Sequence, residues 1–259
     1  MQCRRLAVLF KVVPDPERVF TVDPISHLPG VDLPPIPSLF DDNAVEAALA
    51  IKEATNCKVF VLCAGQANAE PMLRRTLAMG ADEAFLIETD ASWDSLGAAR
   101  VLASALRELG EFDVVLCGRE AADTAAGLVG PYVAQALGMP FLTLVNRIKV
   151  VDDRLEVHRP CDGGHDIFLC RPPVLLTISS EANTPRMPSV LKMMKVKNTP
   201  IQRLLLDPRT VAPLPGPAKA DVSGRSTPSY TGQCRFIEGA TAAETASGLL
   251  QALRAEKVI

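Results

Sequence analysis

The sequence predicts an α/β fold: a Rossmann-like, doubly wound and mostly parallel sheet with added antiparallel strands and a C-terminal arm that ends in a helix. First, short apolar runs alternate with helical patterns of about 10–15 residues up to Leu137, which is typical of right-handed βαβ crossovers. Second, these apolar runs are continuous, as in strands covered by helices on both faces. Third, closely spaced strand patterns with short turns follow Leu137, which indicates antiparallel pairing.

Strands and helices alternate in the first half of the chain. Leu6–Val13 is a strand pattern, and the seven prolines within residues 14–40 predict a long irregular excursion after it. Asp41 or Asp42 can cap the helix that follows. The apolar positions of that helix are Val45, Ala48, Leu49 and Ile51; the later strands are Lys58–Cys63, Glu83–Ile87 and Asp113–Cys117, and the later helices are Glu70–Met79 (with Gly80 as its C-cap), Ser95–Leu109 and one from Val129 to Leu137.

The second half predicts strands, an arm and a last helix. Residues 196–240 are rich in Pro, Gly and Ser without sustained periodicity, and Thr241 is a plausible cap for a helix over 241–257. We therefore expect a nucleotide-binding α/β domain over 1–195 and an arm with a pairing helix over 196–259. The predicted strands are Phe141–Val145, a hairpin of Arg147–Val151 with Leu155–Arg159, then His165–Cys170 and Pro173–Ile178.

Composition excludes several classes of protein. The formal net charge of −3 argues against a general nucleic-acid binder. No apolar run approaches the roughly 18 residues that span a bilayer, and Lys11 interrupts the first apolar stretch, which therefore makes a poor signal peptide. The seven cysteines contain no Cys-x-x-Cys pair, so we expect reduced, mostly buried thiols in a cytoplasmic protein.

Residues 113–137 carry the clearest functional signal. An apolar run stops at Gly118, small residues follow it, and a helical pattern begins near Val129. Such a turn suits an anion or a nucleotide, because the helix N-terminus offers free N–H groups and small residues let a ligand approach the backbone. The turns at Lys11–Val13, Ala64–Gln66 and Gly118–Ala126 all fall at the carboxyl ends of predicted parallel strands, where ligands bind in such sheets.

No catalytic apparatus stands out. Neither usual phosphate-loop motif is present, and no Gly-x-Ser-x-Gly occurs. A metal pair of His158 and His165 is conceivable, with exposed polar positions as the alternative. Asp162 and Asp166 could form a carboxylate pair, although a solvated turn explains them as well. We expect neither a metal site nor catalytic residues.

Five runs in order resemble the beta subunit of electron transfer flavoproteins, a family that includes nitrogen-fixation (FixA-like) and electron-bifurcating members. Together they span about residues 5–201. The runs are Phe40 to Leu49 with Ile51-Lys52-Glu53, Leu77 to Asp82, the segment that opens at Gly118, Val157 to Gly164 leading to Pro173 to Thr177, and Asn183 to Val190 with Met194 to Lys197 after it.

The resemblance implies a subunit that carries electrons without catalytic residues of its own. Its partner, the alpha subunit, would hold the redox-active FAD, and this subunit would bind AMP or, in the alternative, a second FAD. Amides at Asp123–Gly127 would hold phosphate as a helix N-terminus does. By position, the nucleotide would contact Leu9, Ser38, Leu39, Phe40, Asp41, Ala64, Gly118, Arg119, Glu120, Ala121, Ala122, Asp123, Thr124, Ala125, Ala126, Gly127, Leu128 and Val129.

The resemblance also implies a docking segment for flavoprotein dehydrogenases. An apolar tip ringed by lysines suits a transient interface, and the alternative is an amphipathic helix that packs on its own domain. The residues of this segment are Met187, Val190, Leu191, Lys192 and Lys195.

Four departures from the family pattern concern these two sites. Ala125 and Leu128 stand where relatives usually carry Asp and Gln, Thr184 replaces Glu, and Met187 replaces Tyr. We expect the backbone to carry more of the nucleotide binding here. A tightly packed Ala/Gly-rich turn is the alternative for the loop, and a stand-alone adenine-nucleotide-binding or hydrolysing domain is the alternative for the chain.

Overall fold

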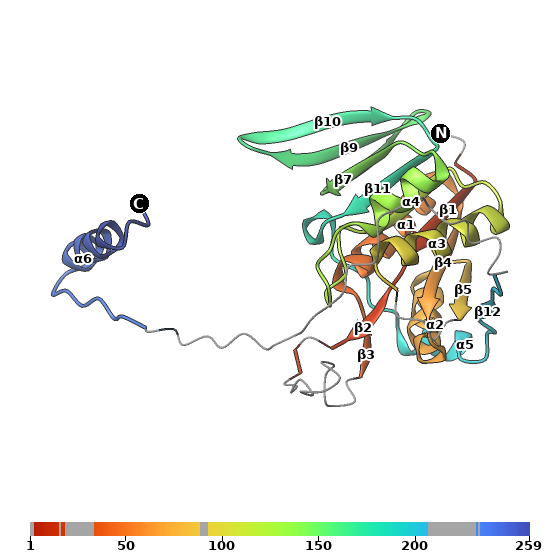
Figure 1. Ribbon diagram of the computed structural model, residues 1–259, viewed down its shortest axis with the longest axis horizontal. Helices are drawn as coiled ribbons and strands as arrows, with labels where there is room; N and C mark the ends of the chain where they lie inside the picture. Colours follow the sequence, from red (N-terminus) through yellow and green to blue (C-terminus); the bar gives the residue numbers. More distant parts are fainter. Residues whose placement is uncertain (1–2, 16, 19–33, 89–92, 207–231, 233) are drawn as a thin grey trace. The chain divides into compact units, whose positions relative to one another are not determined.

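The computed structural model describes residues 3–15, 17–18, 34–88, 93–206, 232 and 234–259 (Figure 1). The chain divides into two compact units, Met1–Phe20 with Pro29–Val222, and Thr21–Leu28 with Ser223–Ile259. Most of the predicted excursion over 14–40 and most of the arm over 196–240 lie outside the described residues. The predicted boundary between residues 195 and 196 stays a prediction.

The larger unit is built on a seven-stranded parallel sheet. Its strand order is β12-β5-β4-β1-β6-β11-β7. On one side of β1 lie β4 and then β5, and on its other side lies β6. The strand order therefore reverses between β1 and β6. Ligands bind at such a reversal point in doubly wound sheets. The strands are β1 (Arg5–Leu9), β4 (Lys58–Gly65), β5 (Glu83–Glu88), β6 (Val114–Gly118), β7 (Phe141–Val145), β11 (Val174–Ile178) and β12 (Gln202–Arg203).

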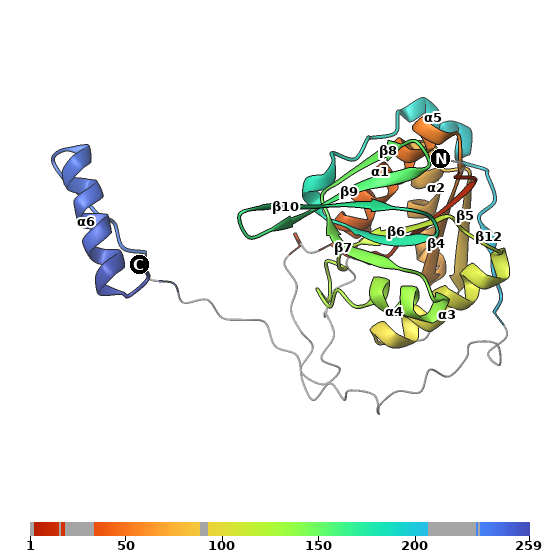
Figure 2. The same cartoon turned by 90° about the horizontal axis from the view of Figure 1, so that it is seen from above.

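Helices cover both faces of this sheet, and successive side chains along β1 point to opposite helix layers. Leu6 and Val8 join the apolar cluster that includes α1 and α2, whereas Ala7 and Leu9 join the cluster that includes α3 and α4 (Figure 2). This explains why the strands are continuously apolar. The helices are α1 (Leu39–Thr55), α2 (Glu70–Met79), α3 (Ser95–Leu109) and α4 (Val129–Leu137).

A separate antiparallel sheet extends the parallel core. Leu155 and Val157 bury its inner face against the α1 side of the core. Smaller elements complete the described part of this unit. The antiparallel sheet has the order β10-β9-β8, from β8 (Arg147–Val151), β9 (Arg154–Cys161) and β10 (Gly164–Cys170); the others are a ribbon of β2 (Val12–Pro14) with β3 (Pro35–Pro37), the 3₁₀ turns η1 (Ala67–Ala69) and η2 (Ser180–Ala182), and helix α5 (Val190–Val196).

The predicted fold class is confirmed, and two of its details are wrong. The predicted strand Leu6–Val13 ends at Leu9, because Val12–Pro14 leaves the main sheet to pair with β3. Neither Asp41 nor Asp42 caps α1: Ser38 has the extended backbone of the N-cap, and both carboxylates lie in the first turn. Gly80 does end α2, with a positive φ of 134°.

The described part of the smaller unit contains α6 (Ala242–Ala255), as the sequence predicts. Thr241 Oγ1 accepts the amide of Glu244, as an N-cap does, and the Glu244 carboxylate accepts the amide of Ala240, the residue before the cap. Leu249 and Leu250 are exposed on this helix. Across the described residues, no helix is both long and apolar enough to cross a membrane.

Candidate functional site

The carboxylate of Asp41 joins three segments at the reversal point of the sheet. Asp41 lies in the first turn of α1 and is buried. Its Oδ1 accepts the amide N–H of Gly118, at the end of β6, at 2.8 Å, and its Oδ2 accepts the amide of Lys11, just after β1, at 2.8 Å. One side chain therefore holds the start of α1 against the ends of the two central strands.

Two further contacts fasten the loop after β6 to the same edge. Lys11 Nζ lies 2.8 Å from both carboxylate oxygens of Asp123. Ser38 Oγ accepts the amide of Ala122 at 3.3 Å, and the Ser38 amide donates to the carbonyl of Lys11 at 2.9 Å. The structure thus brings the predicted residues Ser38, Asp41 and the loop together, and it adds Lys11, which only its place directly after a strand could have suggested.

Gly118 is required by the close approach of α1. A Cβ at this position would lie 2.6 Å from Phe40 Cβ and 2.7 Å from Asp41 Oδ1. Gly130 is equally confined, because its Cβ would lie 2.8 Å from Cys117 Sγ. Tight packing therefore explains these two glycines, whereas residues 122–126 between them are exposed.

The loop turns away from helical geometry just before α4. Ala125 and Gly127 have φ values of 47° and 64°, the left-handed region that disfavours a residue with a Cβ such as Ala125. Because α4 begins only at Val129, the prediction that Asp123–Gly127 provide its N-terminal amides is wrong. Within the described part of the chain, the amides of Ala126, Gly127 and Leu128 have no hydrogen-bond acceptor. These three amides and the following helix start form the part of the loop that suits an anion.

Burial controls the electrostatics of Asp41. Desolvation raises the pKa of this carboxyl to about 7, although the two amide hydrogen bonds and Lys11 favour the charged form. The protonation state of the group that organises this edge therefore changes near neutral pH.

The other predicted contact residues surround this edge. The Arg119 guanidinium lies 4.6 Å from the centre of the Phe40 ring and 2.9 Å from Glu120 Oε1. Ala64 lies near the end of β4, and the Leu9 side chain is buried in the core. Of the remaining predicted positions, Leu39 and Leu128 are exposed, and Ala121 and Val129 are half-buried.

The residues directly before the predicted docking segment are held against the same helix, α1. Asn43 Nδ2 donates to the carbonyl of Asn183 at 2.9 Å, and Asn183 Nδ2 donates to the carbonyl of Asn43 at 3.0 Å. Arg186 pairs with Glu46 at 2.8 Å and with Glu53 at 2.6 Å. Burial alone would raise the pKa of Glu46, but the hydrogen bonds from Arg186 hold it below its usual value.

The docking residues that follow Arg186 are exposed. Exposed fractions are 79% for Met187, 75% for Val190 and 73% for Leu191, although α5 itself lies against α2. Lys192 and Lys195 are also exposed. The structure thus brings the five predicted docking residues onto one short exposed segment, whose apolar side chains are largely uncovered.

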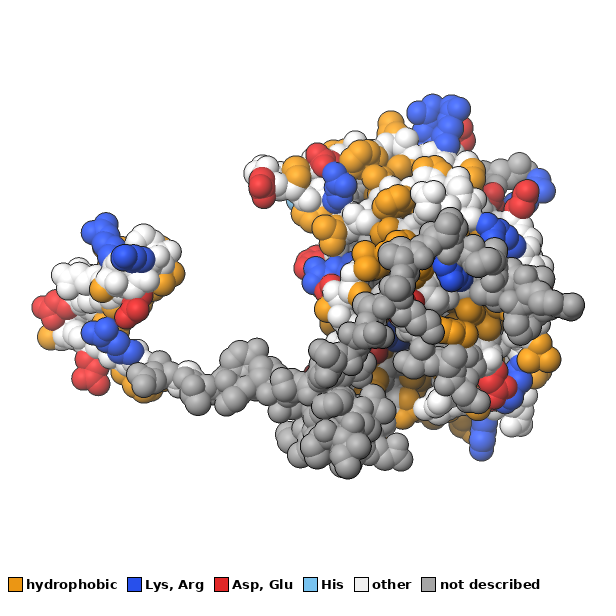
Figure 3. All heavy atoms as spheres, in the orientation of Figure 1, with side chains coloured by type: hydrophobic (Ala, Val, Ile, Leu, Met, Phe, Trp, Pro, Cys, Tyr) orange, Lys and Arg blue, Asp and Glu red, His pale blue; other side chains and the backbone are white. Residues whose placement is uncertain are grey.

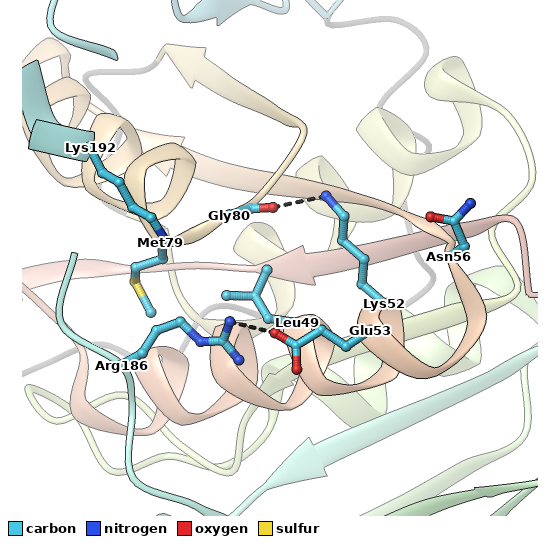
Figure 4. Close-up of a pocket in the computed structure, with 8 residues that line it drawn as sticks. All are labelled: Leu49, Lys52, Glu53, Asn56, Met79, Gly80, Arg186 and Lys192. Atoms are coloured by element: carbon cyan, nitrogen blue, oxygen red, sulfur yellow. Dashed lines mark hydrogen bonds and ion pairs between the residues drawn. The ribbon is translucent and has the colours of Figure 1, made fainter. Parts of the chain in front are cut away.

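A pocket of about 360 Å³ lies beside this segment, at the far end of α1 from Asp41 (Figure 4). Leu49 and Met79 contribute its apolar lining, and Lys52 donates to the carbonyl of Gly80 at 2.9 Å. Periodicity along the sequence gave no sign of this hollow, because it forms where α1, α2 and the docking segment meet. Its lining residues are Leu49, Lys52, Glu53, Asn56, Met79, Gly80, Arg186 and Lys192.

His158 and Asp166, from the two pairs that the sequence suggested, each contact another charged side chain. His158 Nε2 lies 2.8 Å from Glu156 Oε1, and the rings of His158 and His165 are 6.4 Å apart. Asp166 pairs with Arg159 at 2.8 Å. Among the described residues, no cluster of three or more His, Cys, Asp or Glu could hold a metal ion.

Known proteins resemble the chain over both the Asp41 edge and the docking segment. The model of the electron transfer flavoprotein domain matches residues 35–208. The electron transfer flavoprotein subunit beta of Thermoanaerobacterium thermosaccharolyticum is 39% identical over 71% of this chain and 72% of that protein. The caffeyl-CoA reductase-Etf complex subunit CarD of Acetobacterium woodii is 34% identical over 98% of this chain and 100% of that protein. Protein FixA of Azorhizobium caulinodans is 35% identical over 69% of this chain and 66% of that protein. The chain belongs to the electron transfer flavoprotein family, as one of its beta subunits.

Proposed function

We propose that the protein pairs with an electron transfer flavoprotein alpha subunit, binds AMP at the Asp41 edge, and helps pass electrons from flavoprotein dehydrogenases to an acceptor through FAD on the alpha subunit. Proteins of this family are electron carriers, which agrees with a site that gathers binding groups and no nucleophile–base pair. The main observation in support of an AMP site here is the position of the Asp41 carboxylate. It holds three segments together at the point where the strand order reverses.

Phosphate is the part of AMP that the loop suits best. The amides of Ala126, Gly127 and Leu128 and the start of α4 offer N–H groups to an anion. Asp123 is paired with Lys11, so its charge is offset where a phosphate would approach. Since Ala125 and Leu128 provide no polar side chain, backbone N–H groups would make most of these contacts.

Exposed apolar side chains support pairing with the alpha subunit. Ile167 and Leu169 on β10 and Phe141 and Leu144 on β7 are between 43% and 60% exposed. Hydrophobic side chains gather over this part of the larger unit (Figure 3). Exposed apolar patches of this kind mark protein interfaces, and the exposed Leu249 and Leu250 of α6 offer a second contact.

The docking segment supports the exchange with dehydrogenases. Val190 and Leu191 form an uncovered apolar tip, and Lys192 and Lys195 beside them would steer an acidic partner. The pocket next to α5 offers room for a side chain of that partner. We place this exchange in the cytoplasm, where cysteines stay reduced, in keeping with the free cysteines of the described chain.

A second FAD in place of AMP is the second candidate. Arg119, at the base of the loop, supports it, because its cationic group stacked on Phe40 could meet a larger anionic ligand. Co-expression with an alpha subunit, followed by release and chromatography of the bound nucleotides, separates the candidates. We expect one FAD and one AMP per heterodimer. Two FAD would favour the second candidate, and a complex without FAD from any alpha subunit would overturn the proposal.

A further inference from the structure

Two buried cysteines lie together at the opposite edge of the sheet from Asp41. Cys3 precedes β1 and Cys57 precedes β4, its neighbour in the sheet. Arg5 is paired with Lys58 in the parallel register, and the Lys58 amide donates to the carbonyl of Arg4 at 2.9 Å. Cys3 and Cys57 are 4% and 2% exposed and belong to the same apolar cluster.

Acidic side chains fix the backbone on both sides of this pair. Asp113 Oδ2 accepts the amides of Arg4 at 2.7 Å and Arg5 at 3.0 Å, which holds the start of β1. Asp82 Oδ2 accepts the amide of Val59 at 2.8 Å, which holds the start of β4. Neighbouring strands lie about 4.8 Å apart, and a disulfide spans Cα atoms roughly 4.4–6.8 Å apart. Cys3 lies ahead of the regular part of β1, and its side chain packs in the same apolar cluster as Cys57.

The two thiols are unequal. The two side chains interact with each other, and this interaction shifts the pKa values of the two thiols in opposite directions. Burial alone raises the pKa of Cys63 to about 12. Because the thiolate is the reactive form of cysteine, one thiol of the pair would act as the nucleophile and the other as the resolving thiol.

We propose that Cys3 and Cys57 form a dithiol–disulfide site that exchanges with low-molecular-weight disulfides of the glutathione class. The thiolate of one cysteine attacks one sulfur of the oxidant, which breaks the oxidant's S–S bond, forms a mixed disulfide and releases one thiol. The other cysteine then gives up its proton, attacks the protein sulfur of the mixed disulfide and displaces the second thiol. In sum, the protein dithiol loses two electrons and two protons, and one oxidised disulfide becomes two thiols. The product ties the start of β1 to the start of β4.

The test uses the full chain with Cys161→Ser and Cys234→Ser, which removes the two exposed thiols and leaves five of the seven cysteines. The protein is equilibrated with glutathione buffers of increasing oxidising strength, because burial makes exchange depend on local opening. We expect two of the five titratable thiols to disappear and a peptide that links Cys3 to Cys57 to appear in the mass spectrum. Reduction by excess glutathione should restore all five.

Matched variants keep the result interpretable. In the same background, Cys3→Ala and Cys57→Ala should each form no internal link and lose at most one thiol, held as a persistent mixed disulfide with glutathione, whereas Cys170→Ala should still lose two. Peptide mapping of the parent protein needs no folded variant, so it tests the Cys3–Cys57 link even if an alanine variant unfolds. The proposal would be overturned if all five thiols persist in the most oxidising glutathione buffer. A link that forms only in urea, or one between other cysteines, would also overturn it.

Discussion

At the scale of single residues, Asp41 matters most because it lies at a junction that no local pattern defines. It contacts residues 30 and 77 positions away in the chain, and it holds the ends of β1 and β6 against α1. The sequence marks Asp41 only as a possible helix cap, since a local pattern cannot show a hydrogen bond to a distant strand end. Only the resemblance placed Asp41 near the nucleotide.

Asp41→Asn should alter how the stability of the protein depends on pH. The native pKa of about 7 is above the ordinary 3.8, so the folded state retains a proton that the unfolded state loses between these values. Native stability therefore carries a penalty that grows as pH rises from about 4 to about 7. Asn resembles the protonated carboxyl and has no such penalty.

Urea unfolding of both proteins at about pH 5 and about pH 8 measures this difference. We expect the stability of Asp41→Asn relative to the parent to rise by on the order of a few kcal/mol between these conditions. The comparison at each pH cancels the other titrating groups that the two proteins share. A stability difference that is the same at both pH values would show that Asp41 is already ionised in the native protein at about pH 5.

At the scale of secondary-structure elements, α1 supports both candidate sites, the edge at Asp41 and the docking segment. Its first turn carries Asp41, and the turns that follow carry Asn43, Glu46 and Glu53, which hold Asn183 and Arg186. The sequence predicted α1 to α4 and the strands of the core well, because each buries a stripe or a face with its own period. It did not predict β12 or the β2–β3 ribbon, since two- and three-residue strands leave no periodic pattern.

Val190→Asp should slow electron delivery from the dehydrogenase without loss of flavin. Val190 is 75% exposed, so a carboxylate there costs little folding stability but cannot enter an apolar pocket of a partner. We expect a decrease of about tenfold or more in the second-order rate, since a buried anchor contributes roughly 2 kcal/mol or more. Stopped-flow reduction of the reconstituted heterodimer measures this rate.

Val151→Asp is the matched control, because Val151 is an exposed valine at the end of β8, away from the docking segment. This variant should keep the parent rate. Equal rates for both variants would mean that α5 does not dock the dehydrogenase, and a large loss of stability in Val190→Asp would favour a helix that packs on its own domain.

At the scale of the whole molecule, the division into two units separates the proposed nucleotide site from one proposed contact with the alpha subunit. The candidate nucleotide edge lies entirely within the larger unit, whereas α6 belongs to the smaller one and exposes Leu249 and Leu250. A stand-alone nucleotide-binding domain would have no use for such a helix. Deletion of residues 235–259 should therefore abolish co-purification with the alpha subunit while the remaining chain keeps the thermal unfolding transition of the larger unit.

A milder test replaces one side chain of α6. Leu250→Asp should weaken pairing with the alpha subunit. Gln251→Asp, which introduces the same residue at the next position of α6, should not. If the deleted chain still co-purifies with the alpha subunit, pairing must rest on the exposed faces of β7 and β10, and α6 would need another role.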